Sequence, residues 1–180
     1  MKRKKLSEIA EIRFGINART QAQGDVVCLQ GKDFDEFGEI DHAGLLYVSE
    51  DQCKDTDFLQ PGDVLFAAKG SRNYAVMWRG EIPRAVASST FFVIRNLDAD
   101  VLPEYLAWYL MSVRAQTFFT QNAKLGTVKT ISKKVLDSLE LQLHTLTDQK
   151  RIAALHQLYV AEQQRITELT EKKKTMIFNL

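Results

Sequence analysis

TLTDQKRIAALHQLYVAEQQRITELTEKKKTMIFNL, residues 145–180, is the stretch that decides the fold of this chain. It contains no glycine or proline, so nothing in it ends a helix once one has begun. Thr145 followed three residues later by Asp148 has the arrangement of a capping box, which marks a helix start. As one helix the stretch reaches ~50 Å at ~1.5 Å per residue, longer than a domain of this size is wide. The sequence therefore predicts a globular domain over residues 1–144 and a long helix over residues 145–180.

The apolar residues of this helix follow the spacing of a coiled-coil seam. Alternating steps of three and four residues connect nine positions, and seven of them are apolar. Leaving an Ile, Leu or Met in water forgoes ~1.5–3 kcal/mol each, which favours a partner helix. The alternative is a helix that folds back on its own domain, which is plausible for its first two turns but not for its far end. We expect dimerisation through Ile152, Leu155, Tyr159, Glu162, Ile166, Leu169, Lys173 and Met176, with Leu180 at the end of the series.

The overall composition is ordinary for a soluble globular protein, with 45% hydrophobic and 26% charged residues in 180. No apolar run approaches the ~20 residues of a membrane span, and MKRKKLSEIAEI lacks the apolar core of a signal peptide. Cys28 and Cys53 have no CxxC partner and no histidine at ligand spacing, so we expect buried or incidental thiols. These features predict a cytoplasmic protein without a membrane segment.

Charge is segregated along the chain although the net charge is only +1. Residues 33–63 carry ten acids and one base, residues 64–95 five bases and one acid, and residues 114–134 five bases and no acid. Such segregation is typical of a fold that meets an anionic ligand on one face. The alternative is a solvated surface whose charges mix again in three dimensions, and charge alone favours this second interpretation.

Upstream of the long helix, short β-like runs come first and helical patterns follow. The runs predicted as strands are VVCLQ (26–30), LLYVS (45–49), DVLFAAKG (63–70), YAVMWRG (74–80), STFFVIRN (89–96) and LELQL (139–143). Helices are predicted over 6–14, 103–121 and 132–139, and KRKK (2–5) as a disordered tail. Strands followed by helices predict the α+β class: a globular domain with a mixed β-sheet core and flanking helices, then one long coiled-coil helix.

The order of several stretches resembles the DNA-specificity subunits of type I restriction–modification systems. They are LQPGDVLFAAKG, LPEYLAWYLMS, GTVKTISKKVLDSLELQL and TLTDQKRIAAL followed by the long charged helix. No single stretch is specific for this family, and the resemblance rests on the order and spacing of all of them together. The resemblance implies a target-recognition domain that reads part of a double-stranded DNA site, and a helix that acts as a spacer and as a docking surface for methyltransferase subunits.

One feature departs from the family pattern as we know it. The usual subunit has two recognition domains and two spacer helices packed antiparallel, whereas this sequence has one of each. The chain therefore resembles a half-subunit, either natural or a fragment. Two copies pairing their helices antiparallel would read two identical half-sites in inverted orientation, which predicts an interrupted palindrome as the target.

Two loops carry the residue types that contact DNA. Phosphates are bound by cations and amides, and base edges are read by Arg, Lys, Asn, Gln, Ser and Thr. In KGSRNY the candidates are Lys69, Ser71, Arg72, Asn73 and Tyr74, where the tyrosine either stacks on a base or packs. The alternative for this stretch is an ordinary polar turn.

The second candidate loop is KLGTVKT, in which a glycine allows close approach of the backbone to a phosphate. Its candidates and flanking cations are Lys124, Gly126, Thr127, Lys129, Lys133 and Lys134, and the weaker candidates elsewhere are Arg19, Thr20, Gln21 and Arg84.

The sequence contains no motif of a known catalytic centre. We find no Gly-rich phosphate loop, G-x-S-x-G or H-E-x-x-H, and the three histidines are scattered. The acidic stretch GKDFDEFGEIDHAG does not match a calcium loop, and its carboxylates also suit turns. We expect a non-catalytic chain without a metal or cofactor, with S-adenosylmethionine bound only by a methyltransferase partner. The alternative function is a coiled-coil scaffold that binds protein and not DNA.

Overall fold

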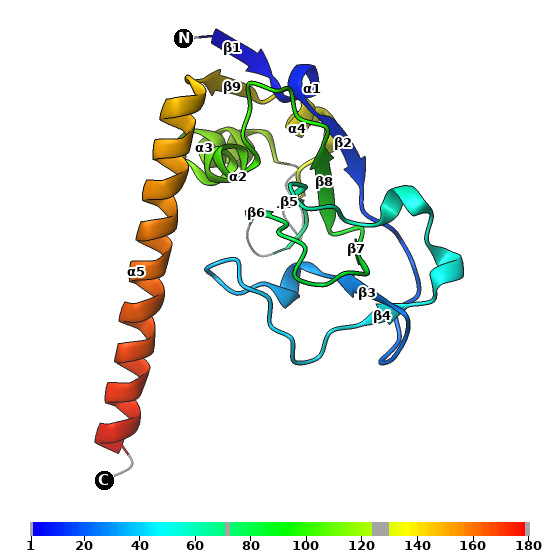
Figure 1. Ribbon diagram of the computed structural model, residues 1–180, viewed down its shortest axis with the longest axis vertical. Helices are drawn as coiled ribbons and strands as arrows, with labels where there is room; N and C mark the ends of the chain where they lie inside the picture. Colours follow the sequence, from blue (N-terminus) through cyan, green and yellow to red (C-terminus); the bar gives the residue numbers. More distant parts are fainter. Residues whose placement is uncertain (1, 71–72, 124–129, 179–180) are drawn as a thin grey trace.

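The computed structural model describes residues 2–70, 73–123 and 130–178. Its strands are β1 (Lys2–Lys5), β2 (Glu11–Phe14), β3 (Val26–Leu29), β4 (Tyr47–Val48), β5 (Val64–Ala67), β6 (Ala75–Met77), β7 (Ala85–Ala87), β8 (Phe91–Arg95) and β9 (Glu140–Leu143). Its helices are α1 (Leu6–Ile9), α2 (Pro103–Met111), α3 (Val113–Asn122), α4 (Lys133–Asp137) and α5 (Leu146–Phe178), with 3-10 turns η1 (Gly31–Asp33), η2 (Glu50–Gln52) and η3 (Asp55–Asp57). Figure 1 shows a globular body with α5 along one side. The α+β class and the long C-terminal helix are confirmed.

The strands form three sheets, and the central one is antiparallel with the order β2-β8-β5-β6. A second sheet has the order β4-β3-β7, in which β3 and β7 are parallel. The third sheet is the antiparallel pair β1-β9. Parallel and antiparallel pairs therefore occur together, as the prediction of a mixed β core required.

The central sheet is buried on both faces, and alternate residues of its strands point to different cores. Val64 and Phe66 of β5 join the core formed with α1 to α4 and β9. Leu65 and Ala67 of the same strand join a second core, which contains residues of β3 and β7 and the fully buried Trp78. This explains why β5 reads as a continuous apolar run and not as an alternating one.

The N-terminal segments differ from the sequence prediction. The helix predicted over residues 6–14 ends at Ile9, because Ala10 is extended and Glu11–Phe14 pairs with β8. Lys2–Lys5 is not a disordered tail, since it forms β1 and pairs with β9. In both cases a strand partner far along the sequence determines the local structure, which helical spacing and charge do not reveal.

Two further differences lie in the middle of the chain. The predicted helix over 103–121 is two helices, because Ser112 ends α2 and caps α3: its hydroxyl donates to the Tyr109 carbonyl and accepts from the Ala115 amide. Strand β7 has only Ala85–Ala87, too short and small-sided to stand out as a β-like run.

Helix α5 is anchored at its start, and one side of it faces the domain as far as Gln164. The Asp148 amide donates to the Thr145 hydroxyl, as expected of the cap. Gln149 is fully buried, and its amide group donates to the carbonyls of Asp100 and His144 while its oxygen accepts from the Leu102 amide. The rest of the helix runs along the globule, and its C-terminal end extends beyond it (Figure 1).

The two sides of α5 have different environments. Ala153 is buried, and Ala153, Val160 and Gln164 line a groove of about 360 Å³ that α2, β6 and residues 37–42 complete. At ~3.6 residues per turn, the predicted seam lies on the opposite side of the helix. Ile152 packs partly against the core, as the alternative allowed for the first turns. The other seam residues in the described range are exposed: Leu155, Tyr159, Glu162, Ile166, Leu169, Lys173 and Met176. Leu180 lies outside the described residues.

Candidate nucleic-acid interface

The described ends of the two loops that the sequence suggested separately lie next to each other. Lys69, which follows β5, forms an isolated antiparallel bridge with Thr130, which precedes α4. Next to it, the Ile131 amide donates to the Ala68 carbonyl at 3.0 Å. These contacts join the chain just after β5 to the residues that lead into α4. Lys69 is exposed there.

Several of the candidate residues in these loops lie outside the described part of the chain. They are Ser71, Arg72, Lys124, Gly126, Thr127 and Lys129. The described residues Lys69 and Thr130, which flank them, are in contact with each other. The contacts of the candidates themselves stay predictions.

Asn73 and Tyr74 have structural partners that explain their positions in the hairpin. The Asn73 amide group donates to the Ala67 carbonyl at 2.9 Å and closes the turn. Tyr74 is 5% exposed, and its hydroxyl donates to the Gly31 carbonyl at 2.6 Å. Its ring lies edge-on to Phe91 at 6.0 Å. Of the two interpretations of Tyr74, packing is therefore the one the structure supports, because a buried ring presents no face to a base.

Arg19 and Arg84 lie elsewhere, around the turn η2. The Arg84 guanidinium forms an ion pair with Glu50 and lies 5.0 Å from the centre of the Phe58 ring. Arg19 is exposed, and its backbone amide donates to the Gln52 side chain at 3.1 Å. The two arginines thus belong to a second group of candidates, and the Arg84–Glu50 pair is an exposed one of the weak surface kind.

Lys133 stands at the first position of α4, which Ser132 caps by accepting from the Val135 amide. Its ammonium group is 2.9 Å from the Asp137 carboxylate, one helical turn on. The side chain stays 40% exposed, so this pair is of the weak surface kind. Lys133 therefore remains available to a phosphate at small cost.

Strand β1 contributes three exposed cations from the stretch predicted as a disordered tail. Lys2, Arg3 and Lys5 are exposed on this strand. Lys4 is different, because its ammonium group lies 2.9 Å from the Asp98 carboxylate, and this hydrogen bond raises the pKa of Lys4. The signal was in the sequence as four consecutive cations, but only the pairing with β9 gives them a fixed position.

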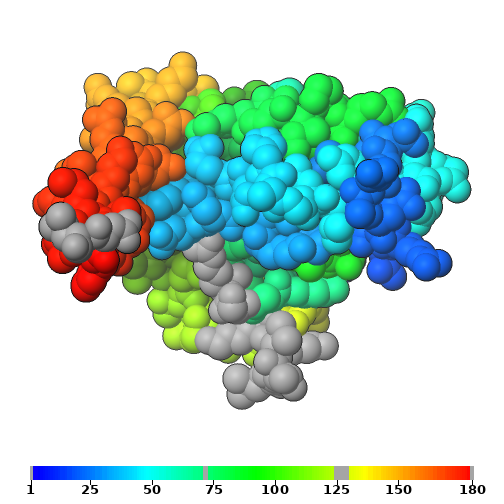
Figure 2. All heavy atoms as spheres, turned by 90° about the horizontal axis from the view of Figure 1, so that it is seen from below, coloured from blue at the N-terminus to red at the C-terminus, as the bar shows by residue number. Residues whose placement is uncertain are grey.

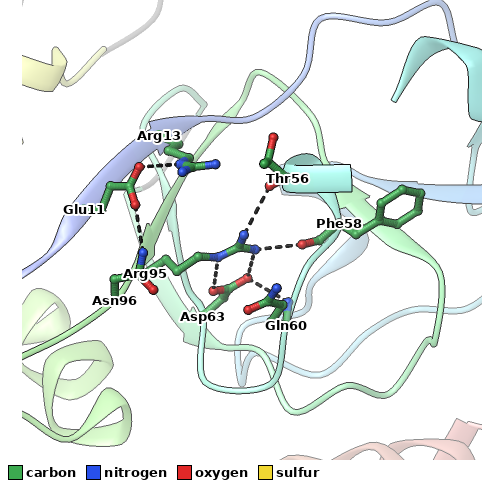
Figure 3. A network of polar contacts seen from close by, with 8 residues as sticks. All are labelled: Glu11, Arg13, Thr56, Phe58, Gln60, Asp63, Arg95 and Asn96. Atoms are coloured by element: carbon green, nitrogen blue, oxygen red, sulfur yellow. Dashed lines mark hydrogen bonds and ion pairs between the residues drawn. The ribbon is translucent and has the colours of Figure 1, made fainter. Parts of the chain in front are cut away.

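A buried ion pair between Arg95 and Asp63 stabilises the start of β5, the strand that leads to Lys69 (Figure 3). The Arg95 guanidinium of β8 donates to both oxygens of Asp63, at 2.8 and 2.6 Å, with only 10% and 3% of the two side chains exposed. The same guanidinium donates to the carbonyls of Thr56 and Phe58. The hydrogen bond to Asp63 raises the pKa of Arg95. Arg95 thereby ties β8 to the start of β5 and to η3.

The acidic segment has a structural role in the described residues. Asp35 accepts hydrogen bonds from the amides of Phe37 and Glu39, and Asp41 accepts one from the Ala43 amide. Carboxylates that accept from amides two to four residues on close turns. The turn interpretation of GKDFDEFGEIDHAG is thus the one these contacts support.

The cysteines fit the expectation of structural thiols. Cys28 is 1% exposed, and burial raises the pKa of its thiol to about 11. Burial also raises the pKa of Cys53. Thiols with raised pKa values are protonated at neutral pH and are poor nucleophiles.

The geometry thus defines an α+β domain in which Lys69 and Thr130 form a bridge, and a long anchored helix whose apolar side faces away from the domain. The model of the type I restriction modification DNA specificity domain matches residues 1–174. The chain belongs to this family of type I restriction–modification specificity domains.

Solved structures with the same fold are subunits of such systems. One chain, from work on complex assembly and conformational transition of a type I R-M system, has a TM-score of 0.63 and 20% identity over 98% of this chain and 43% of that chain. The S subunit from M. genitalium has 0.62 and 13%, over 97% and 42%. The HsdS subunit from Thermoanaerobacter tengcongensis has 0.62 and 20%, over 92% and 39%. The chain spans about two-fifths of the length of these structures. A search of curated proteins finds no match.

These similarities concern the fold, which is one that supports recognition of a DNA sequence. Among the described helices, including α5, no stretch has the length and apolarity of a membrane span.

Proposed function

We propose that this chain is the sequence-reading subunit of a type I restriction–modification complex and directs its methyltransferase, and its nuclease where the complex has one, to a DNA target. The observation that carries the proposal is the family match over residues 1–174, and the bridge between Lys69 and Thr130, at the described ends of the two candidate loops, is consistent with it. A protein that recognises a DNA sequence needs its loops held in fixed positions, because contacts to base edges require a defined position relative to the phosphates.

The chain acts in this proposal as an antiparallel homodimer that reads an interrupted palindrome. The support is the orientation of the seam on α5: its apolar side chains point away from the domain to which the helix is anchored. Leu155 and Leu169 are 66% and 57% exposed in the single chain, which is costly unless a second surface covers them. A two-fold axis across the paired helices places the two domains at opposite ends and relates their half-sites by inversion.

The chain itself is non-catalytic in this proposal, and S-adenosylmethionine is held by the methyltransferase subunits. The sequence contains no motif of a known catalytic centre, which supports this view. The complex then works in the cytoplasm on double-stranded DNA, with methyltransferase subunits docked on the paired helices.

A coiled-coil scaffold without DNA binding is the second candidate. It is favoured by the net charge of +1, since domains that bind DNA alone are often clearly basic. The low net charge is compatible with the first candidate when the methyltransferase subunits supply part of the positive charge that binds the DNA phosphates.

Retention on duplex DNA at increasing salt, with and without a methyltransferase partner, separates the two candidates. The first predicts salt-dependent binding that the partner strengthens, and the second predicts none in either case. Variants of the two loops then test the surface: replacing Arg72 alters the preferred sequence, and replacing Lys124 weakens all DNA about equally. Binding that survives both changes intact would place the reading surface elsewhere.

A further inference from the structure

The seam of α5 contains two charged residues, and neither has an ion-pair partner among the described residues of its own chain. They are Glu162 and Lys173, both exposed. Only four other charges of the described helix are in local ion pairs: Lys174 with Glu171 at 2.6 Å, and Arg151 with Asp148 at 3.6 Å. A charge left inside an apolar seam is unfavourable unless an opposite charge faces it.

We infer that Glu162 of one copy pairs with the partner's Lys173, and that this pair, formed twice by symmetry, fixes the antiparallel register of the helix dimer. The inference rests on the proposed homodimer and adds the register to it. In the same alignment, Ile166 faces the partner's Leu169, and Tyr159 faces the partner's Met176. Every described seam position from Tyr159 to Met176 then meets either an apolar residue or its opposite charge.

Other arrangements of the same two helices leave charges unmatched. A parallel, in-register pair places Glu162 against the partner's Glu162 and Lys173 against the partner's Lys173, which is repulsive. An antiparallel shift by one heptad places Lys173 against the partner's Leu155 or the partner's Leu169. Charge complementarity therefore selects one register among these.

A shift by two heptads is the strongest competitor, because it places Lys173 opposite the partner's Asp148. Asp148 already has partners at the start of α5: it accepts a hydrogen bond from the Thr145 hydroxyl at 2.7 Å and lies beside Arg151. In that register Glu162 faces the partner's Tyr159 and has no cation. The register with Glu162 opposite the partner's Lys173 satisfies both seam charges and leaves the cap undisturbed.

Charge exchange in the full-length chain tests the register. Glu and Lys have similar helix propensities, so the variants E162K, K173E and E162K/K173E should all stay helical. Each single reversal is expected to raise the dimer dissociation constant about tenfold or more in analytical ultracentrifugation, and the double variant to restore it to within about threefold of wild type. E168K is the matched control, because Glu168 lies off the seam on the same helix, and it should leave the constant unchanged.

A label distance provides a second readout that needs no seam variant. Spin labels at the exposed position Lys150 are expected ~53 Å apart along the helix axis in the proposed register and ~32 Å apart after a two-heptad shift, at ~1.5 Å per residue.

The outcomes separate the register from the dimer. A wild-type dimer in which the double variant is no tighter than the weaker single variant overturns the register alone. Rescue of K173E by D148K, or the shorter label distance, also overturns it in favour of the competitor. A wild-type chain that stays monomeric at high concentration contradicts the homodimer of the proposed function, and the register with it.

Discussion

Replacing Ile166 and Leu169 by alanine should dissociate the dimer without unfolding the chain. In one chain these side chains are 50% and 57% exposed, so about half of each is left for a partner to bury. Full burial of such a side chain is worth ~1.5–3 kcal/mol, which makes half of it about 1 kcal/mol. Four side chains in two copies then contribute about 4 kcal/mol, and the dissociation constant should rise on the order of a thousandfold.

The assay is sedimentation velocity over a concentration series, with circular dichroism to check that the helix persists. Alanine is the strongest helix former, so I166A/L169A should keep its helical signal. F178A is the matched control: Phe178 is 81% exposed on the same helix but on the side opposite the seam, and its loss should leave the dimer intact. An unchanged dissociation constant for I166A/L169A, or equal weakening by F178A, would refute the reasoning.

Three further predictions concern Arg95 and Lys69 of the globular domain and His156 of α5. R95M leaves the Asp63 carboxylate buried without its cation, so the free energy of unfolding should fall by about 3–5 kcal/mol in thermal unfolding. R13M is the control, because it removes only an exposed pair and should lower the free energy of unfolding by under about 1 kcal/mol. Equal losses in the two variants would contradict a stabilising role of the Arg95–Asp63 pair. K69Q should weaken binding to all duplexes about equally and lower the slope of log affinity against log salt by about one, and a change confined to one sequence would mean that Lys69 reads a base. Burial lowers the pKa of His156, so the folded state binds its proton less readily than the unfolded chain. The contribution of neutral His156 to the free energy of unfolding is present above the unfolded-state pKa of ~6.5 and is lost as pH falls through the folded-state pKa. H156Q should flatten this pH dependence of the free energy of unfolding in denaturant titrations.

Local sequence signals predicted the parts of the fold that depend on neighbours in the chain. The start of α5 at the Thr145 cap and the strands around Val64–Ala67 and Phe91–Arg95 follow from capping chemistry and apolar runs. The direction of the seam is also local, because helical spacing alone places its residues on one side.

The parts that were missed depend on partners distant in the sequence. Lys2–Lys5 is a strand only because β9 lies beside it, and Glu11–Phe14 leaves the helical pattern to pair with β8. The same holds for the candidate interface: the bridge from Lys69 to Thr130 joins two loops that no local pattern connects. The burial of Tyr74 follows from its hydroxyl reaching Gly31, a contact across 43 residues.

The shape of the DNA target tests the account most directly. Mapping methylated bases after the chain is expressed with its methyltransferase subunits gives the recognised sequence without any assumption about the protein's contacts. A two-fold dimer predicts a site of two identical half-sites in inverted orientation with a fixed gap, and the methylation should disappear with I166A/L169A. Two different half-sites, a single uninterrupted site, or methylation that does not depend on the chain would contradict it.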